Sequence, residues 1–417
     1  MTITFNMQAP WADDPQAKFG PRGFPLLPGG FGRSTYFTGA TPTYVVKGSG
    51  CTLTDNHGRE LIDANNNFTT LIHGVAHPEI TEAAVQAIST GNCWGIPNAY
   101  EWAHAEALLS RFPDLDQVRY SNSGSEAVMT AIRLARAATG RGAVLMTRAG
   151  YHGSSDIALS TGNEKERRGI PKGVTNDVFL VDLNDTEGLK QTVEENPTGF
   201  AAIVIDLLPN RAGLTALTKD YVETARALAS RHGIVLIVDE VISLRLHHGG
   251  YIGTYGVKPD LLTTGKLIGG GFPVGAMVGI EPLMRLLDPT RSESIPQAGT
   301  FSGNPVSMAA GTVALCLLTP DVIARMNRQG AEARDAIGTR IATVGWHVRG
   351  DGSLLRPFPD NGSYDITTQR KLWWAAYERG VLLSPANLAS LSSAMSDAVV
   401  ADIAERLADA VVSVATV

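Results

Sequence analysis

Between about residues 140 and 280 the chain alternates short apolar runs with segments of helical period, and this alternation constrains the fold more than any other feature. The apolar runs are rich in Val, Ile and Leu and are bounded by Gly, Asp or Asn, as is typical of buried strands. They are residues 142–146, 178–181, 201–207, 234–238 and 261–264, and helical spacing occurs at 126–138 and 221–231. Strands that alternate with helices predict an α/β fold of three layers, with a mainly parallel sheet covered on both faces.

The segments on either side of this region show other patterns. Residues 1–60 are rich in Pro and Gly, and two alternating runs at 44–47 and 52–55 predict a hairpin-like meander. After about residue 310, helical patterns mix with strand-like pieces, which predicts a smaller α+β domain. We therefore expect an N-terminal arm and meander over residues 1–65, a large domain over 66–310 and a C-terminal domain over 311–417.

Composition and charge exclude several classes of function. The 35 basic and 41 acidic residues give a net charge of −6 without any basic block, so nothing indicates nucleic-acid binding. The three cysteines suit neither a disulfide framework nor a zinc site, and we expect no metal. Residues 1–15 lack the apolar core of a secretory signal, and no apolar run approaches the ~20 residues of a membrane span. We expect a cytoplasmic protein without a membrane partner.

Four features lie where α/β sheets bind ligands, at the ends of strands and the starts of helices. The first is the run Ser-Asn-Ser-Gly-Ser-Glu at 121–126, which leads directly into a predicted helix. Its hydroxyl groups, its glycine and the positive end of the helix would suit a phosphate. Taken alone, the run is more simply an ordinary serine N-cap.

Charged residues follow two of the predicted strands. Asp239 and Glu240 come after 234–238, where a carboxylate can hold a cationic ring nitrogen or a metal, or can face solvent. Lys266 comes after 261–264 and precedes three consecutive glycines. Burial at such a place would lower the pKa of the lysine amine and make it a better nucleophile, unless the side chain lies at the surface.

The fourth feature is Tyr151, an aromatic ring in the loop after 142–146 that would ordinarily be a packing residue. Together the four features match the needs of pyridoxal phosphate, which requires a lysine, an acid against its ring nitrogen, an aromatic lid and a helix start for its phosphate. A Rossmann dehydrogenase is excluded, because no GxGxxG opens a helix after a strand.

Several longer motifs extend over nearly the whole chain. They are Leu-Pro-Gly-Gly at 27–30, Asp63, Gly-Val-Ala-His-Pro-Glu at 74–79, Arg-Tyr-Ser-Asn-Ser-Gly-Ser-Glu-Ala at 119–127, Tyr-His-Gly at 151–153, Val-Asp-Glu-Val at 238–241, Thr-Gly-Lys-Leu-Ile-Gly-Gly-Gly at 264–271 and Gly-Thr-Phe-Ser-Gly-Asn-Pro at 299–305. In these motifs and their order the chain resembles the class III (subgroup II) aminotransferases, which are pyridoxal-phosphate enzymes of fold type I. It is most similar to the branch that holds glutamate-1-semialdehyde aminomutase and the β-amino-acid (β-phenylalanine-type) aminotransferases.

The resemblance implies pyridoxal 5'-phosphate as the cofactor, bound in the large domain, and assigns roles around its ring. Lys266 would form the Schiff base with the cofactor and Asp239 would pair with the pyridinium nitrogen, so that both are catalytic. Val241 would pack under the ring, and Tyr151 would stack on the opposite face with His152 beside it.

The resemblance also implies how the phosphate is held and how chains assemble. Ser123, Gly124 and Ser125 would bind the phosphate within one chain. Thr300 would reach the same phosphate from the neighbouring subunit, which implies a homodimer with shared active sites. Without the resemblance, Thr300 would be an ordinary loop threonine.

The resemblance is weaker in the substrate pocket. Arg33 stands where the β-amino-acid aminotransferases bind a carboxylate, although it is equally interpreted as a loop arginine, and Phe68 occupies a pocket position. The second carboxylate-binding arginine of those enzymes is missing after 384–385, and the aminomutase's glutamate is missing from 386–391. Arg211 stands near the family's asparagine, so it either contacts the phenolic oxygen of the cofactor or binds a substrate anion.

These observations favour an aminotransferase with two small-molecule partners, an amino donor and a keto-acid acceptor. The donor is an amino acid, with the β-amino acids suggested by Arg33, and the two half-reactions alternate in a ping-pong scheme. A 2,1-aminomutase of the glutamate-1-semialdehyde type is the main alternative, against which the missing acid argues. A racemase and a catalytically idle binding protein on the same fold are weaker alternatives.

Overall fold

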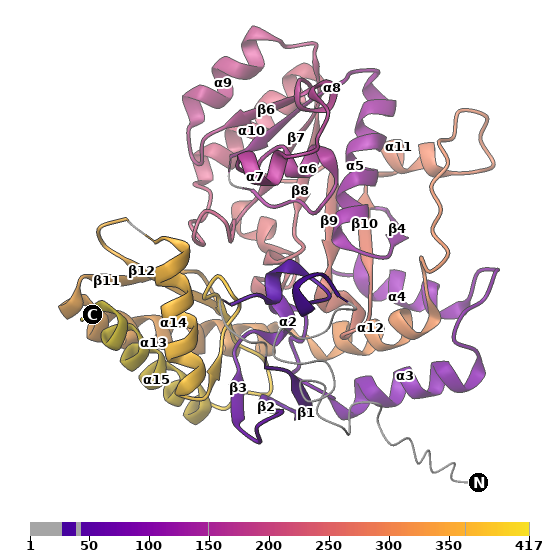
Figure 1. Cartoon of the computed structure of the whole chain (residues 1–417). Coiled ribbons are helices and arrows are strands. Elements are labelled where there is room, and N and C mark those ends of the chain that lie inside the picture. Colours follow the sequence, from indigo (N-terminus) through magenta and orange to yellow (C-terminus); the bar gives the residue numbers. More distant parts are fainter. Residues whose placement is uncertain (1–26, 39–42, 149, 363, 417) are drawn as a thin grey trace.

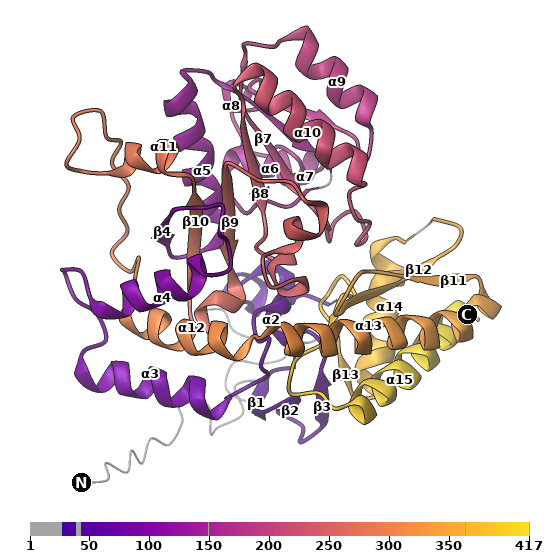
Figure 2. The ribbon, with the colours of Figure 1, turned by 180° about the vertical axis from the view of Figure 1, so that it is seen from behind.

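A computed structural model describes residues 27–38, 43–148, 150–362 and 364–416 (Figure 1). The segment 1–15, for which the sequence predicts no secretory signal, and the first part of the predicted arm lie outside these residues. The centre of the molecule is a seven-stranded sheet of order β4-β10-β9-β8-β7-β5-β6 (Figure 2). Its strands are β4 (Gln117–Ser121), β5 (Ala143–Thr147), β6 (Val178–Val181), β7 (Phe200–Asp206), β8 (Val235–Asp239), β9 (Leu261–Gly265) and β10 (Gly275–Gly279).

The five predicted strands correspond to β5–β9, which are all parallel. The sequence did not reveal β4 and β10. β10 runs antiparallel to both of its neighbours, β4 and β9, and returns from β9 through a short turn without a long helix. The alternation of strand and helix therefore stops before this edge of the sheet.

Each face of the sheet has its own core, because successive strand residues point to opposite sides. Val144 and Met146 pack with the apolar side of α5 (Gly124–Thr139) on one face. Leu145 packs with α9 (Thr186–Glu195) and α10 (Lys219–His232) on the other. The predicted three-layer α/β fold is thus confirmed, and it is the fold type I of the pyridoxal-phosphate transferases.

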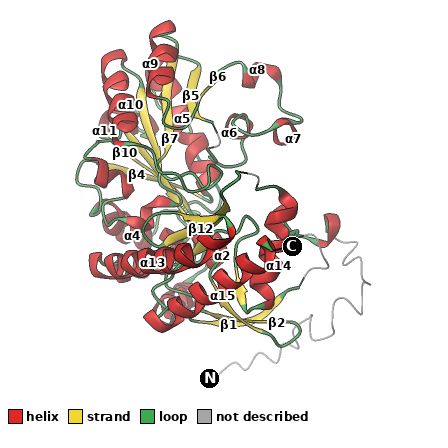
Figure 3. Cartoon of the chain, turned by 90° about the vertical axis from the view of Figure 1, so that its left-hand side faces the viewer, coloured by secondary structure: helices red, strands yellow, loops and turns green. Residues whose placement is uncertain are grey.

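A second body joins the two ends of the described chain (Figure 3). Its first sheet has the order β1-β2-β3-β13, in which β13 from the C-terminal part lies parallel to β3. Its strands and helices are β1 (Val45–Ser49), β2 (Thr52–Asp55), β3 (Glu60–Asp63), β11 (Trp346–Arg349), β12 (Leu354–Pro359), β13 (Val381–Leu382), β14 (Ala389–Ser390), α13 (Pro320–Ile341), α14 (Ile366–Glu378) and α15 (Asp397–Ala415). The boundaries given above at 65 and 310 stay a prediction.

Three helices lie under the large sheet: α3 (Pro78–Thr90), α4 (Ala99–Leu109) and α12 (Pro305–Leu317), with α12 packed on the other two. Asn304 caps α12 by accepting hydrogen bonds from two backbone N–H groups, and Pro305 occupies its first turn, so these two residues set the start of the helix. The remaining helices are short: α2 (Asn66–Thr69), α6 (Asp156–Leu159), α7 (Glu164–Arg167), α8 (Lys172–Thr175) and α11 (Glu281–Met284).

Among the residues that the structure describes, no single helix has the length and hydropathy of a membrane span. Only α12 and the following segment Pro320–Val344, taken together, have this length and hydropathy, and the pair is bent by 72° at the break between them. The same residues contain no group of three or more His, Cys, Asp or Glu side chains arranged to hold a metal ion.

Candidate active site

The candidate site lies at the carboxyl ends of the parallel strands. In the register of the sheet Asp206 of β7 is paired with Asp239 of β8, and Asp239 is paired with Thr263 of β9. The loops that carry Tyr151 and Lys266 leave β5 and β9 at the same edge. Parallel pairing therefore brings together residues that are more than a hundred positions apart in the sequence.

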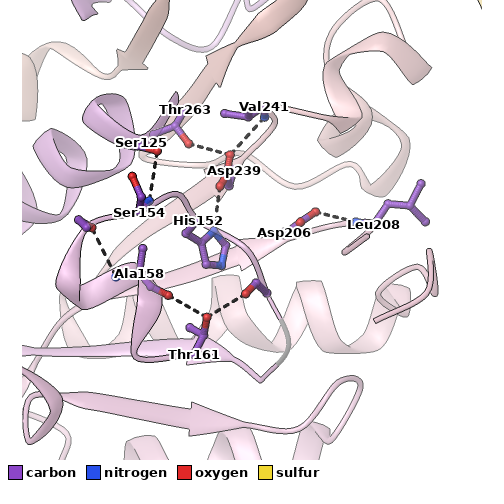
Figure 4. Close-up of polar contacts among 12 residues, drawn as sticks. Ser125, His152, Ser154, Ala158, Thr161, Asp206, Leu208, Asp239, Val241 and Thr263 are labelled. Atoms are coloured by element: carbon purple, nitrogen blue, oxygen red, sulfur yellow. Dashed lines mark hydrogen bonds and ion pairs between the residues drawn. The ribbon is translucent and has the colours of Figure 1, made fainter. Parts of the chain in front are cut away.

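Asp239 is held by three hydrogen bonds (Figure 4). Its Oδ2 accepts from His152 Nδ1 at 2.8 Å, and its Oδ1 accepts from Thr263 Oγ1 at 3.1 Å and from the backbone N–H of Val241 at 3.2 Å. Burial opposes a charge on His152, but the hydrogen bond and the negative charges of Asp239 and Asp206 outweigh it and raise the pKa of the imidazole. This hydrogen bond fixes the orientation of the Asp239 carboxyl group.

Asp206 is a buried acid for which the sequence analysis gave no role. The backbone N–H of Leu208 donates to its Oδ1 at 3.0 Å (Figure 4). Burial and then the charge of Asp239 raise the pKa of Asp206 from 3.8 to about 7. Its position at the end of a predicted strand, as for Asp239, was the signal that could have identified it.

Lys266 is the first residue of the short 3-10 helix η5 (Lys266–Gly269), directly after β9. Burial lowers the pKa of its amine from 10.5 to about 8, against the opposing effects of Asp239 and Asp206. This is the direction that its position predicted. The lysine also adopts a left-handed backbone conformation with a φ of 51°, which costs a residue with a Cβ about 1 kcal/mol or more.

The loop at 121–126 joins β4 to α5. Ser123 is the N-cap of α5 and its Oγ accepts from the N–H of Glu126 at 3.3 Å, while Ser125 Oγ accepts from the N–H of Ser154 at 3.2 Å. Added Cβ atoms at Gly124 and Gly153 would crowd Val241 and Ser125. The serine N-cap is thus present, and tight backbone packing at the N-terminus of a long helix gives a cradle that fits a phosphate, whose binding there stays a prediction.

Tyr151 and Arg211 form one unit with Glu166, which the sequence analysis did not identify. The guanidinium carbon of Arg211 lies 4.6 Å from the centre of the Tyr151 ring, and its Nη2 donates to Glu166 Oε1 at 2.5 Å. Glu166 is itself fixed, because its Oε2 accepts from the backbone N–H of Asn163 at 3.0 Å. The guanidinium of Arg211 is about a quarter exposed and is already paired with a carboxylate, and both roles given for Arg211 stay predictions.

Arg33 and Phe68, which precede the large sheet in the sequence, lie close to each other. Arg33 Nη2 donates to Asn67 Oδ1 at 2.9 Å, and its guanidinium carbon lies 5.0 Å from the centre of the Phe68 ring. Phe68 belongs to α2, a turn in which all four residues have positive φ angles between 46° and 74°. Asp63 Oδ1 stabilises this left-handed turn by accepting from the N–H groups of Asn65 and Asn66.

Thr300 lies on the exposed segment between α11 and α12, next to Phe301, whose side chain is 60% exposed. Within the part of the chain that is described, Thr300 makes no hydrogen bond. Its contact with the phosphate of a neighbouring subunit stays a prediction.

Comparisons with known proteins agree with this geometry. Residues 36–411 match the family described as Aminotransferase class-III. A glutamate-1-semialdehyde 2,1-aminomutase of Heliobacterium modesticaldum is 34% identical over 396 residues, which cover 89% of this chain and 90% of the relative. Among solved structures, an omega-transaminase from Sphaerobacter thermophilus is 36% identical with a TM-score of 0.89, covering 93% of this chain and 95% of that one. A β-phenylalanine aminotransferase from Variovorax paradoxus is 26% identical with a TM-score of 0.86, covering 92% and 90%.

Proposed function

Because the chain belongs to the class III aminotransferases, whose cofactor is pyridoxal 5'-phosphate, we propose that it is a transaminase that moves the amino group of a carboxylated amine to a keto acid. A β-amino acid is the proposed donor. The described residues fit the cofactor: a buried lysine of low pKa, a buried aspartate and a phosphate cradle lie at one edge of the sheet. When bound, pyridoxal phosphate supplies an aldehyde that captures amino groups and a ring that withdraws electrons.

The residues around the site would hold the cofactor ring and the proton on its nitrogen. Asp239, oriented by its hydrogen bond with His152, would hold a proton on the ring nitrogen. Ser123, Gly124 and Ser125 would bind the phosphate through the start of α5, as the geometry of that loop supports. Tyr151 and Val241 would lie on the two faces of the ring.

Lys266 is the proposed proton carrier. An amine whose pKa is about 8 takes up and releases a proton easily near neutral pH, which suits an acid and base that acts twice in each turnover. The left-handed backbone at Lys266 sets the direction in which its side chain leaves the main chain.

The choice of a transaminase depends on one observation above all. The segment 384–392 contains no acidic residue, and it packs against the left-handed turn through the hydrogen bond from Asn66 Nδ2 to the carbonyl of Ser390 at 2.6 Å. The cationic side chain beside that turn is Arg33, which supports a carboxylated substrate. An aminomutase remains the second candidate, because curated relatives such as that of Heliobacterium modesticaldum bear this name.

An assay with and without a keto acid separates the two functions. Purified holoenzyme is mixed with a β-amino acid, and product is followed by chromatography with and without 2-oxoglutarate or pyruvate. We expect product beyond one equivalent of enzyme only when the keto acid is present. Repeated turnover of glutamate-1-semialdehyde to 5-aminolevulinate without any acceptor would instead identify the aminomutase.

We also propose a homodimer in which Thr300 completes the partner's site. In the described part of the chain, large apolar residues are exposed near Thr300, on α4 and just before α4. Ile96 is 76% exposed, Trp102 is 69% exposed and Phe301 is 60% exposed. A second copy of the chain that covers these side chains would bring its own Thr300 near the shared surface.

A further inference from the structure

A buried histidine, His104, connects the two segments that hold the ends of the proposed cofactor. It lies on α4 and is fully buried. One of its nitrogens, Nε2, is 2.7 Å from the backbone carbonyl of Ile268, two residues after Lys266. The other, Nδ1, is 2.7 Å from the hydroxyl of Tyr120, near the end of β4 and directly before the phosphate loop.

The direction of these two hydrogen bonds follows from their partners. A carbonyl oxygen can only accept, so Nε2 of His104 carries the proton and donates it to Ile268. Burial lowers the pKa of His104 to about 4, so the ring is neutral and Nδ1 accepts from the hydroxyl of Tyr120. The chain of donors therefore runs from Tyr120 through His104 to the turn that carries the lysine.

The surroundings leave this arrangement little freedom. A Cβ on Gly311 of α12 would overlap the carbonyl oxygen of Ile268 and lie 2.8 Å from Nε2 of His104. A glycine at this position thus lets α12 close over the hydrogen bond. The carbonyl of Tyr120 also accepts from Gln297 Nε2 at 3.1 Å, which ties the segment before Thr300 to the same network.

We propose that His104 is a positioning residue for Lys266: by holding the carbonyl of Ile268 it fixes the η5 turn, and with it the place of the lysine amine relative to the phosphate loop. A strained left-handed residue persists only where its neighbours determine its conformation. His104 provides this restraint at the turn, and Tyr120 provides it for the histidine. The proposal rests on the attachment of the cofactor to Lys266.

The test uses a matched pair of buried histidines. His73 resembles His104 in burial, in its pKa of about 4 and in its two hydrogen bonds, to the carbonyl of Ala314 at 2.9 Å and to Ser393 Oγ at 2.8 Å. Among the described residues, neither of these hydrogen-bond partners belongs to the lysine turn. The variants His104→Leu and His73→Leu should therefore lose similar thermal stability, and only the first should disturb the lysine.

The readout is the pH titration of the visible absorbance band of the lysine-linked cofactor in the holoenzyme. Burial lowers the pKa of the Lys266 amine, Asp239 and Asp206 oppose this effect, and Arg245 of η3 (Ser243–Leu246) adds to it. A loosened turn admits water, which favours the protonated linkage, so the midpoint of His104→Leu should rise by about half a unit or more. His104→Gln, which can both donate and accept, should restore most of the shift. His73→Leu should keep the wild-type midpoint.

An unchanged midpoint in soluble His104→Leu, or an equal shift in His73→Leu, would overturn the proposal. If His104→Leu does not fold, Tyr120→Phe, which removes only one hydroxyl group, must show a smaller upward shift, and its absence would overturn the proposal equally. A visible band that persists in Lys266→Ala would instead contradict the proposed function, because the cofactor would then be attached elsewhere.

Discussion

Four buried titratable side chains determine what this site can do: Lys266, Asp239, His152 and Asp206. Burial and neighbouring charges of this group shift the pKa values of Lys266, His152 and Asp206. Lys266 and Asp239 were predictable, since each directly follows a short apolar run. The hydrogen bond from His152 to Asp239 and the pairing of Asp206 with Asp239 were not, because both depend on strand register and loop conformation.

Removal of the lysine amine is the first test at this scale. Lys266→Ala should lower kcat by roughly 10²–10⁴-fold or more, because the variant loses its acid and base. The fold should survive, since the side chain ends in the site. The measurement is steady-state turnover together with the circular dichroism spectrum. Wild-type turnover in a folded variant would contradict the role of Lys266.

The raised pKa of Asp206 predicts that the stability of the cofactor-free protein depends on pH. Its folded pKa, about 7, exceeds the ordinary 3.8, so between these values the folded state holds a proton that the unfolded state has lost. The contribution of this group to the free energy of unfolding therefore falls as pH rises through this window. Asp206→Asn should remove that loss, so the melting temperature of the variant minus that of the wild type should increase between about pH 5 and about pH 8.

Asp182→Asn is the control, because Asp182 is an exposed partner of Arg148. Its difference in melting temperature should stay flat over the same range. A flat difference for Asp206→Asn as well would show that the buried acid does not take up a proton on folding.

At the scale of elements, β10 packs directly against the phosphate loop. Gly275 is paired with Ser121 of β4 and with Gly265 of β9, and a Cβ at this position would overlap the carbonyl oxygen of Ser123. Gly275→Ala should therefore displace the loop and weaken cofactor binding by about tenfold or more, a change of ~1.4 kcal/mol in binding free energy. The measurement is a spectroscopic titration of the cofactor-free protein with pyridoxal phosphate.

Gly279→Ala on the same strand separates this effect from a general loss of stability. Its added Cβ would meet the flexible side chains of Leu261 and Met284 and no backbone of the phosphate loop. The control should lower the melting temperature and leave the affinity for the cofactor unchanged. Equal affinities in both variants would contradict the support that we assign to β10.

Some elements could not be predicted from local pattern. The left-handed turn α2 contains Asn, Asn, Phe and Thr, of which only the asparagines tolerate positive φ angles well. Its conformation is enforced by hydrogen bonds to Asp63 and Ser390, and Ser390 is more than three hundred residues away in the sequence. By contrast, β5–β9, α5 and α10 follow their hydrophobic periods closely, because each buries one face or is buried on both.

At the scale of the whole molecule, the proposed dimer can be tested by a change on the surface that we expect to be covered. Trp102→Glu places a charge on an exposed apolar side chain of α4 and should prevent association, because burial of an unpaired charge is costly. We expect a monomer by light scattering and a loss of activity, since Thr300 would no longer reach the partner's phosphate. An active monomer would contradict the shared site, and a dimeric variant would place the interface elsewhere.

The general architecture was accessible from the sequence, whereas the joining of the chain ends was not. Five apolar runs were enough to predict the parallel sheet and its two covered faces. The pairing of β13 with β3 connects residues 381–382 with 62–63, and no local pattern reports such a distant contact. The same limit applies to substrate recognition, because Arg33 contacts Asn67 and Phe68 only through the folded arrangement of that second body.

The proposed amino transfer is tested most directly by the visible absorbance spectrum of the holoenzyme after addition of a β-amino acid without any keto acid. We predict that the visible band of the lysine-linked cofactor disappears as the amino group moves to the cofactor, and that a keto acid then restores it. A band that is present but unchanged by carboxylated amines, or that does not return with a keto acid, would contradict the proposed transaminase.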